Sequence, residues 1–208
     1  MRPLPVVRAA VRRDQERAVH TLAQAFWADP FLRYFYPDES VRRRRIRRFF
    51  DLLWRANMDD GWIDVAGAGE AVALWRRPGR WRVPRRTMFA QLPRMALAYG
   101  LAAGRVLAAL RCMERHHPLE PHWYLMTLGT DPAAQGLGLG SALVRAGLAR
   151  CDMLGLAAYL ESGSAANIPF YEGLGFRLLE EVRVPDGPIF FPMRREASTL
   201  RAADQQGL

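Results

Sequence analysis

Alternating glycines in one short turn are the most chemically suggestive feature of the sequence. Gly136, Gly138 and Gly140 lie in the stretch QGLGLGS, between a strand-like run and a helix-like run. Glycine lets the backbone turn tightly and bring its N–H groups close to a ligand. A helix that follows adds unpaired N–H groups and the positive end of its dipole. The turn therefore predicts a cradle for a pyrophosphate.

Two other phosphate-binding motifs agree less well with this turn. A Walker A loop is excluded because the chain contains no lysine. The alternating glycines also differ from the G-x-G-x-x-G spacing of dinucleotide sites. Glu161, however, ends the next predicted strand, where such sites place an acidic residue. Spacing alone thus leaves the dinucleotide alternative open.

Side chains that can move protons lie in the same half of the chain. Tyr171 is on a predicted short helix, and a phenol with a pKa near 10 stays protonated at pH 7 and can donate a proton. Glu161, Glu120 and His122 lie at strand ends and could accept one. The alternatives are a core aromatic for Tyr171 and a cap or ion pair for Glu161. The pair His116-His117 lies in a loop-like stretch, and we expect it to be exposed to solvent.

The second half of the chain supplies the elements that must position these groups. Strands are predicted over 122–130, 156–162, 176–184 and 188–195, with a turn at 185–187. A helix follows the glycine-rich turn, and a short helix runs from Asn167 to Leu174 and ends at Gly175.

The first half reads as a strand, three helices, a hairpin and two further helices. The strand covers 5–10, and Asp14 is expected to cap a helix that Asp29-Pro30 stops. Helical segments follow over 31–38 and about 38–58, then a hairpin of 62–67 and 70–77, and two helices between about 87 and 115. Six arginines within 42–48 predict either a solvated helix face or an anion-binding patch.

Composition limits the class of protein. A chain of 208 residues that is 50% hydrophobic and 25% charged is expected to form one domain, here 1–208. The formal net charge of +9 attracts anions of any kind. Arg105 interrupts the most apolar stretch, so no membrane span is expected, and the N-terminus lacks the apolar region of a signal peptide. Two isolated cysteines suggest no disulfide or metal site, so we expect a cytoplasmic protein.

A specific resemblance adds to this interpretation. Gln135-x-x-Gly138-x-Gly140 matches the Q/R-x-x-G-x-G/A signature of the GNAT N-acetyltransferase superfamily. The order and spacing of EPHWYLMTLGTDPAAQGLGLGSAL, AYLES, NIPFYEGLGF, PDGP and MRR resemble the bacterial branch that includes puromycin N-acetyltransferases. The resemblance covers nearly the whole chain and is strongest over 120–175. It departs from that branch at PGRWRVPRR, residues 78–86.

The resemblance implies an α/β fold, in which a mixed, mostly antiparallel central sheet has two splayed parallel strands and is flanked by helices. A helical insertion is expected at about 84–118 and a flexible tail at about 197–208. It also implies acetyl-CoA as co-substrate, no metal, and these cofactor-binding residues: Leu128, Gly129, Thr130, Gln135, Gly136, Gly138, Leu139, Gly140, Ser141, Asn167 and Tyr171. For Asn167 a helix cap is the alternative role.

By the same resemblance, Tyr171 is the general acid for the leaving thiolate. Glu161 is the candidate general base, because it ends a strand that should point at the active site. His122, Glu120 or water remain alternatives for the base. A backbone N–H near Leu128 would stabilise the oxyanion. Four aromatic side chains are expected to bind the acceptor, although aromatic stripes on helices are often core; these residues are Phe31, Tyr34, Tyr36 and Tyr124.

The predicted function is transfer of an acetyl group from acetyl-CoA to a primary amine of a small molecule, within a ternary complex. A protein or peptide acetyltransferase and a catalytically silent acyl-CoA sensor are the alternatives. We expect no nucleic-acid partner, since no nucleic-acid motif accompanies the positive charge. The expected assembly is a monomer or a homodimer, with no membrane partner.

Overall fold

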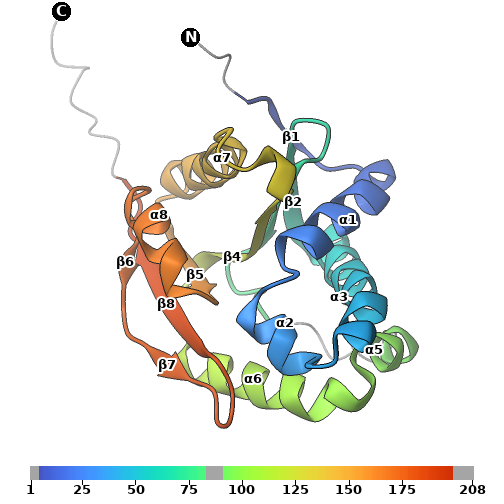
Figure 1. The fold of residues 1–208 in the computed structure, drawn as a ribbon. Coiled ribbons are helices and arrows are strands. Elements are labelled where there is room, and N and C mark those ends of the chain that lie inside the picture. Colours follow the sequence, from blue (N-terminus) through green and yellow to red (C-terminus); the bar gives the residue numbers. More distant parts are fainter. Residues whose placement is uncertain (1–4, 83–90, 199–208) are drawn as a thin grey trace, which may run out of the picture.

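A twisted central sheet organises the chain (Figure 1). The computed structural model describes residues 5–82 and 91–198. Within them the sheet has 8 strands. Their bounds are β1 Val7–Ala9, β2 Gly61–Ala66, β3 Ala71–Arg76, β4 His122–Thr130, β5 Ala157–Ser162, β6 Arg177–Leu178, β7 Val182–Arg183 and β8 Ile189–Arg195.

The sheet is mixed and mostly antiparallel. The strand order is β1-β2-β3-β4-β5-β8-β6, and β7 also pairs with β8. Only β4 and β5 pair in parallel among the described strands. The predicted fold class is therefore confirmed, and the predicted bounds of β4 agree with the observed ones.

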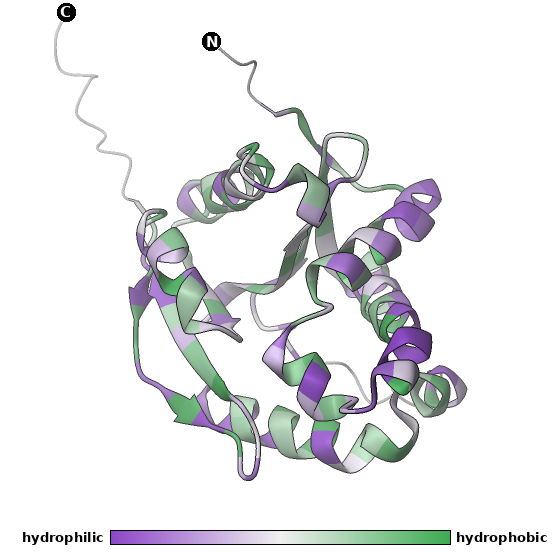
Figure 2. Cartoon of the chain, in the orientation of Figure 1, coloured by the Kyte–Doolittle hydropathy of each residue, from purple (hydrophilic) through white to green (hydrophobic). Residues whose placement is uncertain are grey.

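Helices cover both faces of the sheet (Figures 1 and 2). Helix α7 packs on β2, β3 and β4, whereas α1 and α3 pack on the opposite face. The helices are α1 Gln15–Ala25, α2 Pro30–Phe35, α3 Glu39–Asp60, α5 Leu92–Tyr99, α6 Ala103–His116, α7 Leu139–Met153 and α8 Ile168–Glu172. Four short 3-10 helices, Arg12–Asp14, Gly100–Ala102, Pro132–Ala134 and Ala165–Asn167, join them.

Strand β3 shows why helices cover both faces of the sheet. All six of its residues are buried. Because side chains alternate along a strand, Val72 and Leu74 join the core under α1 and α3, while Ala73 and Trp75 join the core under α7. The continuous apolar run of β3 is thus typical of a central strand.

Local capping chemistry accounts for the starts of two helices and fails at a third. Asp29 caps α2 by accepting the N–H groups of Phe31 and Leu32, and Asp38 caps α3. Asp14 also precedes a helix, but its carboxylate accepts the N–H of Val11 and a guanidinium pair from Arg8 instead. The predicted cap of α1 by Asp14 is therefore wrong, because a nearby arginine competes for that carboxylate.

The strand predicted over 176–184 is divided in two. Residues 177–178 form β6 and residues 182–183 form β7, both paired with β8. Opposite the gap lies Pro192 of β8, which has no N–H to donate to a neighbouring strand. Leu179 still donates its N–H to the Pro192 carbonyl, at 2.9 Å. The ladder therefore breaks where proline removes a donor.

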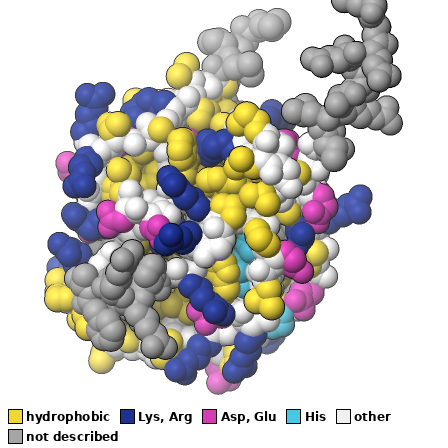
Figure 3. Space-filling view, turned by 180° about the vertical axis from the view of Figure 1, so that it is seen from behind, with side chains coloured by type: hydrophobic (Ala, Val, Ile, Leu, Met, Phe, Trp, Pro, Cys, Tyr) yellow, Lys and Arg dark blue, Asp and Glu magenta, His cyan; other side chains and the backbone are white. Residues whose placement is uncertain are grey.

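The arginine run at the start of α3 is only partly a solvated face. Arg42 is buried, donates to the Tyr36 carbonyl and lies over the Trp27 ring. Arg45 donates to the carbonyls of Leu97 and Ala98 at the end of α5. The other four arginines of the run are exposed. On the face in Figure 3, basic side chains are spread out rather than gathered in one strip.

One helical stretch differs from the expectation that the chain contains no segment able to span a membrane. Leu92–His116 is long and apolar enough, over 25 residues, to span a bilayer by length and composition. The uninterrupted apolar run within it, on which the prediction of no span was based, is shorter because Arg105 interrupts it. Gly100, with φ of 50°, divides the stretch into α5 and α6, which pack against α3 and α2. Of its most apolar window, 22% is buried inside the structure.

Candidate active site

The two parallel strands separate before they end. Pairing between β4 and β5 runs from His122 opposite Ala157 to Leu125 opposite Leu160, and goes no further. The last five residues of β4, 126–130, therefore have no partner on the β5 side. Their outward N–H and C=O groups, around Leu128 and Thr130, are available to an extended ligand lying between the strands.

A bulge helps to separate the strands. The register between β3 and β4 shifts between Leu74 and Trp75, which face Thr127 and Leu125. Met126 is thus the extra residue on β4, and such a bulge turns the strand away from its neighbour. Gly129 follows, and a Cβ there would lie 2.8 Å from Leu22 of α1. Glycine at this position lets α1 approach the backbone that borders the opening.

The glycine-rich turn lies beside this opening. Gly136 and Gly138 adopt φ of 76° and 77°, a left-handed conformation that favours glycine. Helix α7 begins directly after Gly138 without a side-chain cap, so the N–H groups of its first turn, Leu139, Gly140 and Ser141, have no capping partner. A Cβ on Gly140 would lie 3.4 Å from the hydroxyl of Thr130 at the end of β4. The predicted cradle residues therefore meet at one edge of the opening, with Gln135 exposed beside them.

Asn167 and Tyr171 come from the short helix α8. Asn167 is exposed and its side chain makes no cap bond, so the alternative role of a helix cap is not realised. Tyr171 is buried against Phe170 and Phe176, and its hydroxyl bonds to no other described residue. Burial raises the pKa of Tyr171 far above its usual value, so this phenol stays protonated.

Glu161 is the centre of a buried polar cluster. Its side chain is 3% exposed. The Tyr124 hydroxyl donates to Oε2 at 2.6 Å, and the Tyr159 hydroxyl donates to Oε1 at 3.1 Å. Burial and the neighbouring carboxylate raise the pKa of both tyrosines well above 10. Two hydroxyl donors stabilise the charged form of a carboxylate that burial alone would disfavour.

His117 completes this cluster, which corrects a prediction. We expected His116-His117 to be exposed, but the His117 side chain is only 2% exposed and its ring stacks on Trp81 with centroids 3.9 Å apart. Its Nδ1 lies 3.4 Å from Oε1 of Glu161, and its Nε2 lies 3.0 Å from Nε2 of His122. The fold brings His117 back from the end of α6, which local sequence could not indicate. His116 pairs with Glu180 nearer the surface.

The bonding pattern determines where protons can be. Nδ1 of His122 lies 2.7 Å from the Glu120 carbonyl, which only accepts, so Nδ1 donates. Burial lowers the pKa of His122, which favours the neutral ring, whose Nε2 then accepts from His117. The remaining His117 nitrogen faces the Glu161 carboxylate, and a proton between them makes that contact attractive. His117 and Glu161 thus share one exchangeable proton. The Glu120 side chain itself is 70% exposed beside Arg194.

Asp29, which was predicted only to stop a helix, is a second buried carboxylate near the opening. Burial raises the pKa of Asp29 to about 6, despite two backbone N–H donors on Oδ1. Its other oxygen faces Gly163, directly after β5, where a Cβ would lie 3.1 Å from Oδ2. The D-P pair at 29–30 was the available signal, since Asp before Pro at a helix start is a cap.

The four predicted acceptor residues occupy different environments. Tyr124 belongs to the Glu161 cluster, and Phe31 is buried next to Gly163. Tyr34 is half-buried below Arg105. Tyr36 is only 1% exposed and its hydroxyl donates to the Ala98 carbonyl, so it joins α2 to α5 as a core residue.

The acid and base candidates lie on opposite faces of the sheet. Tyr171 packs in the core under α7 together with Leu160. Glu161, the next residue along β5, projects to the other face because side chains alternate. The opening between β4 and β5 lies between these two side chains. No group of three metal-ligating side chains occurs in the described ranges. The arrangement can therefore hold an extended ligand between a proton donor and a proton acceptor.

Comparison with known proteins agrees with this geometry. The acetyltransferase (GNAT) family model matches residues 47–176, more than half of the chain. An uncharacterised N-acetyltransferase of Schizosaccharomyces pombe is 25% identical over 93% of this chain and 84% of its own length. A mycothiol acetyltransferase of Geodermatophilus obscurus is 50% identical, but over 24% of this chain and 17% of that protein.

Solved structures extend the comparison. A Corynebacterium glutamicum protein, described as histone acetyltransferase HPA2 and related acetyltransferase, is 33% identical with a TM-score of 0.72, over 94% of this chain and 97% of that one. The polyamine N-acetyltransferase of Drosophila melanogaster shares the fold, with 16% identity and a TM-score of 0.59 over 92% and 99% of the two chains. The protein belongs to the GNAT acetyltransferase family.

Proposed function

We propose that this protein transfers the acetyl group of acetyl-CoA to a primary amine of a small molecule, while both substrates are bound. One observation carries the proposal. The Glu161 carboxylate is buried among two tyrosine hydroxyls and a histidine, on the sheet face opposite Tyr171, where β4 and β5 part. That arrangement suits an amine that must lose a proton and a thiolate that must gain one.

The residues around the opening suit acetyl-CoA as co-substrate. The unpaired edge of β4 at Leu128, Gly129 and Thr130 can bond the amides of the pantetheine arm as a further strand would. The N–H groups from Gly136 to Ser141 suit the pyrophosphate at a helix start. Asn167, whose amide makes no cap bond, is free to bond the same arm.

Glu161 removes the proton that an ammonium must lose before it can attack. The path away from Glu161 runs through His117 to Nε2 of His122, whose Nδ1 donates to the Glu120 backbone carbonyl. Each proton transfer by a positioned group contributes about 10²- to 10⁴-fold to the rate. The His117–His122 pair therefore gives Glu161 a means to return to its accepting state.

The acetyl carbonyl oxygen and the departing thiolate need a hydrogen-bond donor and a proton donor. A backbone N–H of β4 near Leu128 is unpaired on the β5 side and can stabilise the charge that develops on the carbonyl oxygen. Tyr171 stays protonated because burial raises its pKa, so it can protonate the departing thiolate.

The acceptor class follows from the side chains near Gly163 and from the relatives. Phe31 and the Asp29 carboxylate both contact the position after β5, which suits an amine attached to an apolar body. Structural neighbours of the same fold act, by their names, on polyamines, agmatine and arylalkylamines. A protein acceptor is the second candidate, because the 33% identical structure is described as a histone acetyltransferase relative.

The test is release of free thiol from acetyl-CoA with a panel of acceptors. The panel contains polyamines, arylalkylamines, aminonucleosides including puromycin, and a histone-tail peptide. We expect turnover with one small-amine class, and loss of at least 100-fold in kcat for Glu161→Gln. Turnover confined to the peptide would favour the second candidate. Tight acetyl-CoA binding without turnover on any acceptor would instead indicate a sensor and contradict the proposal.

A further inference from the structure

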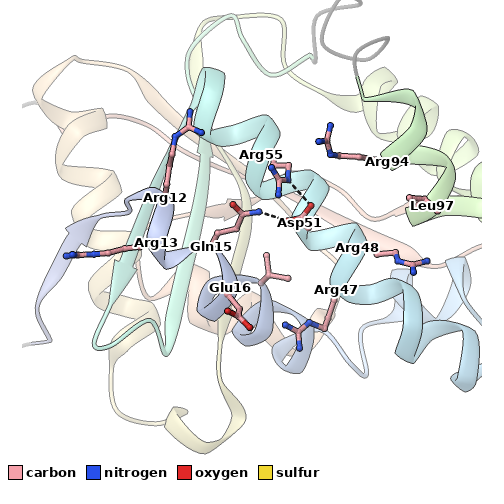
Figure 4. A pocket seen from close by; sticks show the side chains of 11 residues that line it. Arg12, Arg13, Gln15, Glu16, Arg47, Arg48, Asp51, Arg55, Arg94 and Leu97 are labelled. Atoms are coloured by element: carbon pink, nitrogen blue, oxygen red, sulfur yellow. Dashed lines mark hydrogen bonds and ion pairs between the residues drawn. The ribbon is translucent and has the colours of Figure 1, made fainter.

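A hollow lined mainly by arginine lies on the outer side of α1 and α3 (Figure 4). Its volume is about 540 Å³, within the range of small-molecule sites. The 3-10 helix before α1, the outer face of α3 and the start of α5 form its walls. Its lining consists of Arg12, Arg13, Gln15, Glu16, Val19, Arg47, Arg48, Asp51, Arg55, Arg94 and Leu97.

Positive charge dominates this hollow, which we call the arginine pocket. Six arginines face two acidic side chains, Glu16 and Asp51. Asp51 is already engaged by Gln15 at 2.5 Å and by Arg55 at 2.9 Å. The other five arginines make no ion pair with any residue in the described ranges. The pocket therefore concentrates like charges that acidic side chains in the described part of the chain neutralise only in part.

The side chains that line the pocket come from separate elements of the fold. Figure 4 shows Arg55 and Asp51 at its centre, with Arg94 turned toward Arg55 from the opposite wall. Arg12 stands on the α1 side and Arg13 points away at the rim. Guanidinium groups from α3 and α5 thus approach one space from two sides.

Not every arginine of the 42–48 run lines the pocket. Arg42 and Arg45 belong to the same helix, yet they bond to backbone carbonyls of Tyr36 and Leu97. Arg47 and Arg48 follow them and line the pocket instead. Packing of α3 against α5 thus uses some arginines as caps and leaves others directed at the hollow.

We propose that the arginine pocket binds a small anion with two or more linked phosphates, either a free polyphosphate or a nucleoside polyphosphate. Guanidinium groups bond phosphate oxygens in pairs, so several arms around one cavity match a ligand with several phosphate groups. An excess of four positive charges needs more than one anionic group for neutralisation. The six arginines gather around one hollow of about 540 Å³, whereas the backbone of a nucleic-acid duplex needs an extended strip.

This site is separate from the acetyl-CoA site proposed above. None of its lining residues belongs to the glycine-rich turn, to β4 or to α8. Binding there is measurable without turnover, so the proposal succeeds or fails independently of the proposed function.

Isothermal titration calorimetry with sodium tripolyphosphate at fixed ionic strength tests the site. We expect saturable binding near one per chain in the wild type, weakened at least tenfold in the double variant Arg48→Gln, Arg94→Gln. The matched control is the double variant Arg111→Gln, Arg177→Gln, which removes two exposed arginines elsewhere and should bind like the wild type. Circular dichroism verifies folding, and KM for acetyl-CoA should stay within twofold in both variants.

Titrations with further ligands distinguish a nucleoside polyphosphate from a free polyphosphate, and phosphate chains from other anions. Adenosine triphosphate that binds tenfold tighter than tripolyphosphate would identify a nucleoside polyphosphate, and equal affinities would identify the phosphate chain alone. The absence of saturable binding, or equal weakening in both double variants, would overturn the proposal. Citrate binding as tightly as tripolyphosphate, or a DNA duplex binding where tripolyphosphate does not, would overturn it as well.

Discussion

Nδ1 of His117 lies 3.4 Å from Oε1 of Glu161, although 44 residues separate them in the chain. The contact joins the end of α6 to the end of β5 and buries both side chains. It gives the candidate base a partner that can take up or supply a proton.

Removal of either partner should change the pH dependence of catalysis. We expect Glu161→Gln to lower kcat by about 10²- to 10³-fold and to abolish the acidic limb of the pH–rate profile. His117→Gln should lower kcat less, by about tenfold, and change the shape of the profile, because it removes the group that can take up the proton from Glu161.

Steady-state rates from pH 5 to 9 provide the measurement. Tyr159→Phe is the matched control, since it removes one hydroxyl donor to Glu161 and keeps the carboxylate and His117. An unchanged profile in His117→Gln would contradict the proton-sharing role.

Tyr171→Phe should lower kcat by about 10- to 100-fold and leave KM for acetyl-CoA nearly unchanged. The substitution removes only the hydroxyl, which bonds to no other described residue, so the melting temperature should also stay the same. Because burial raises the pKa of Tyr171, the wild type should show no loss of rate from this group up to about pH 10. Wild-type kcat in Tyr171→Phe would exclude this residue as the acid.

Gly138→Ala should weaken acetyl-CoA binding more than it weakens the fold. Its φ of 77° strains any L side chain, by about 1 kcal/mol, although open space surrounds the position. Gly155 has a similar φ of 63°, also open space, and lies at the far end of α7, so Gly155→Ala is the matched control. We expect similar melting temperatures for both variants, and a KM raised about tenfold only for Gly138→Ala. Equal KM values would argue against the cradle.

Asp29 should make stability depend on pH with an unusual sign. Burial raises its pKa to about 6, so between about pH 4 and 6 the folded state binds more protons than the unfolded state. The free energy of unfolding contributed by this group therefore falls as pH rises through that window. Asp29→Asn keeps a cap acceptor without the charge and should be more stable at pH 7.5, by about 1–2 kcal/mol.

Urea unfolding at pH 4.5 and 7.5 measures this effect. Asp38→Asn is the control, because Asp38 also caps a helix but hydrogen bonds from Ser40 and Val41 lower its pKa. That variant should lose stability at pH 7.5. A stability loss in Asp29→Asn at pH 7.5 would contradict the assigned sign.

Alanine substitutions at two helical glycines should change stability in opposite directions, because only Gly147 of α7 packs against β3. A Cβ on Gly147 would lie 2.2 Å from the buried Trp75 ring, so Gly147→Ala should destabilise the protein by about 2–3 kcal/mol. Gly104 lies in α6 with open space around it, and Gly104→Ala should stabilise by about 0.5–1 kcal/mol. Equilibrium unfolding in urea compares them, and destabilisation by Gly104→Ala would show that the helix packs there more closely.

Local sequence determined much of this protein. The run HWYLMTLGT over 122–130 predicted β4, and the glycine spacing predicted a turn that opens a helix, because φ above zero and helix starts depend on a few adjacent residues. The family signature predicted the mixed sheet and the parted strands. The candidate residues Glu161, Asn167 and Tyr171 were also recognisable from their place in that signature.

Tertiary structure decided the features that join distant segments. Folding buried His117 beside Glu161, turned Arg42 and Arg45 into structural contacts, and directed Arg48 and Arg94 at one hollow. It also moved Asp14 from its expected cap to Arg8. Each outcome depends on which side chains meet across helices and strands, and the burial of a polar group is set by those long-range partners rather than by its neighbours in the chain.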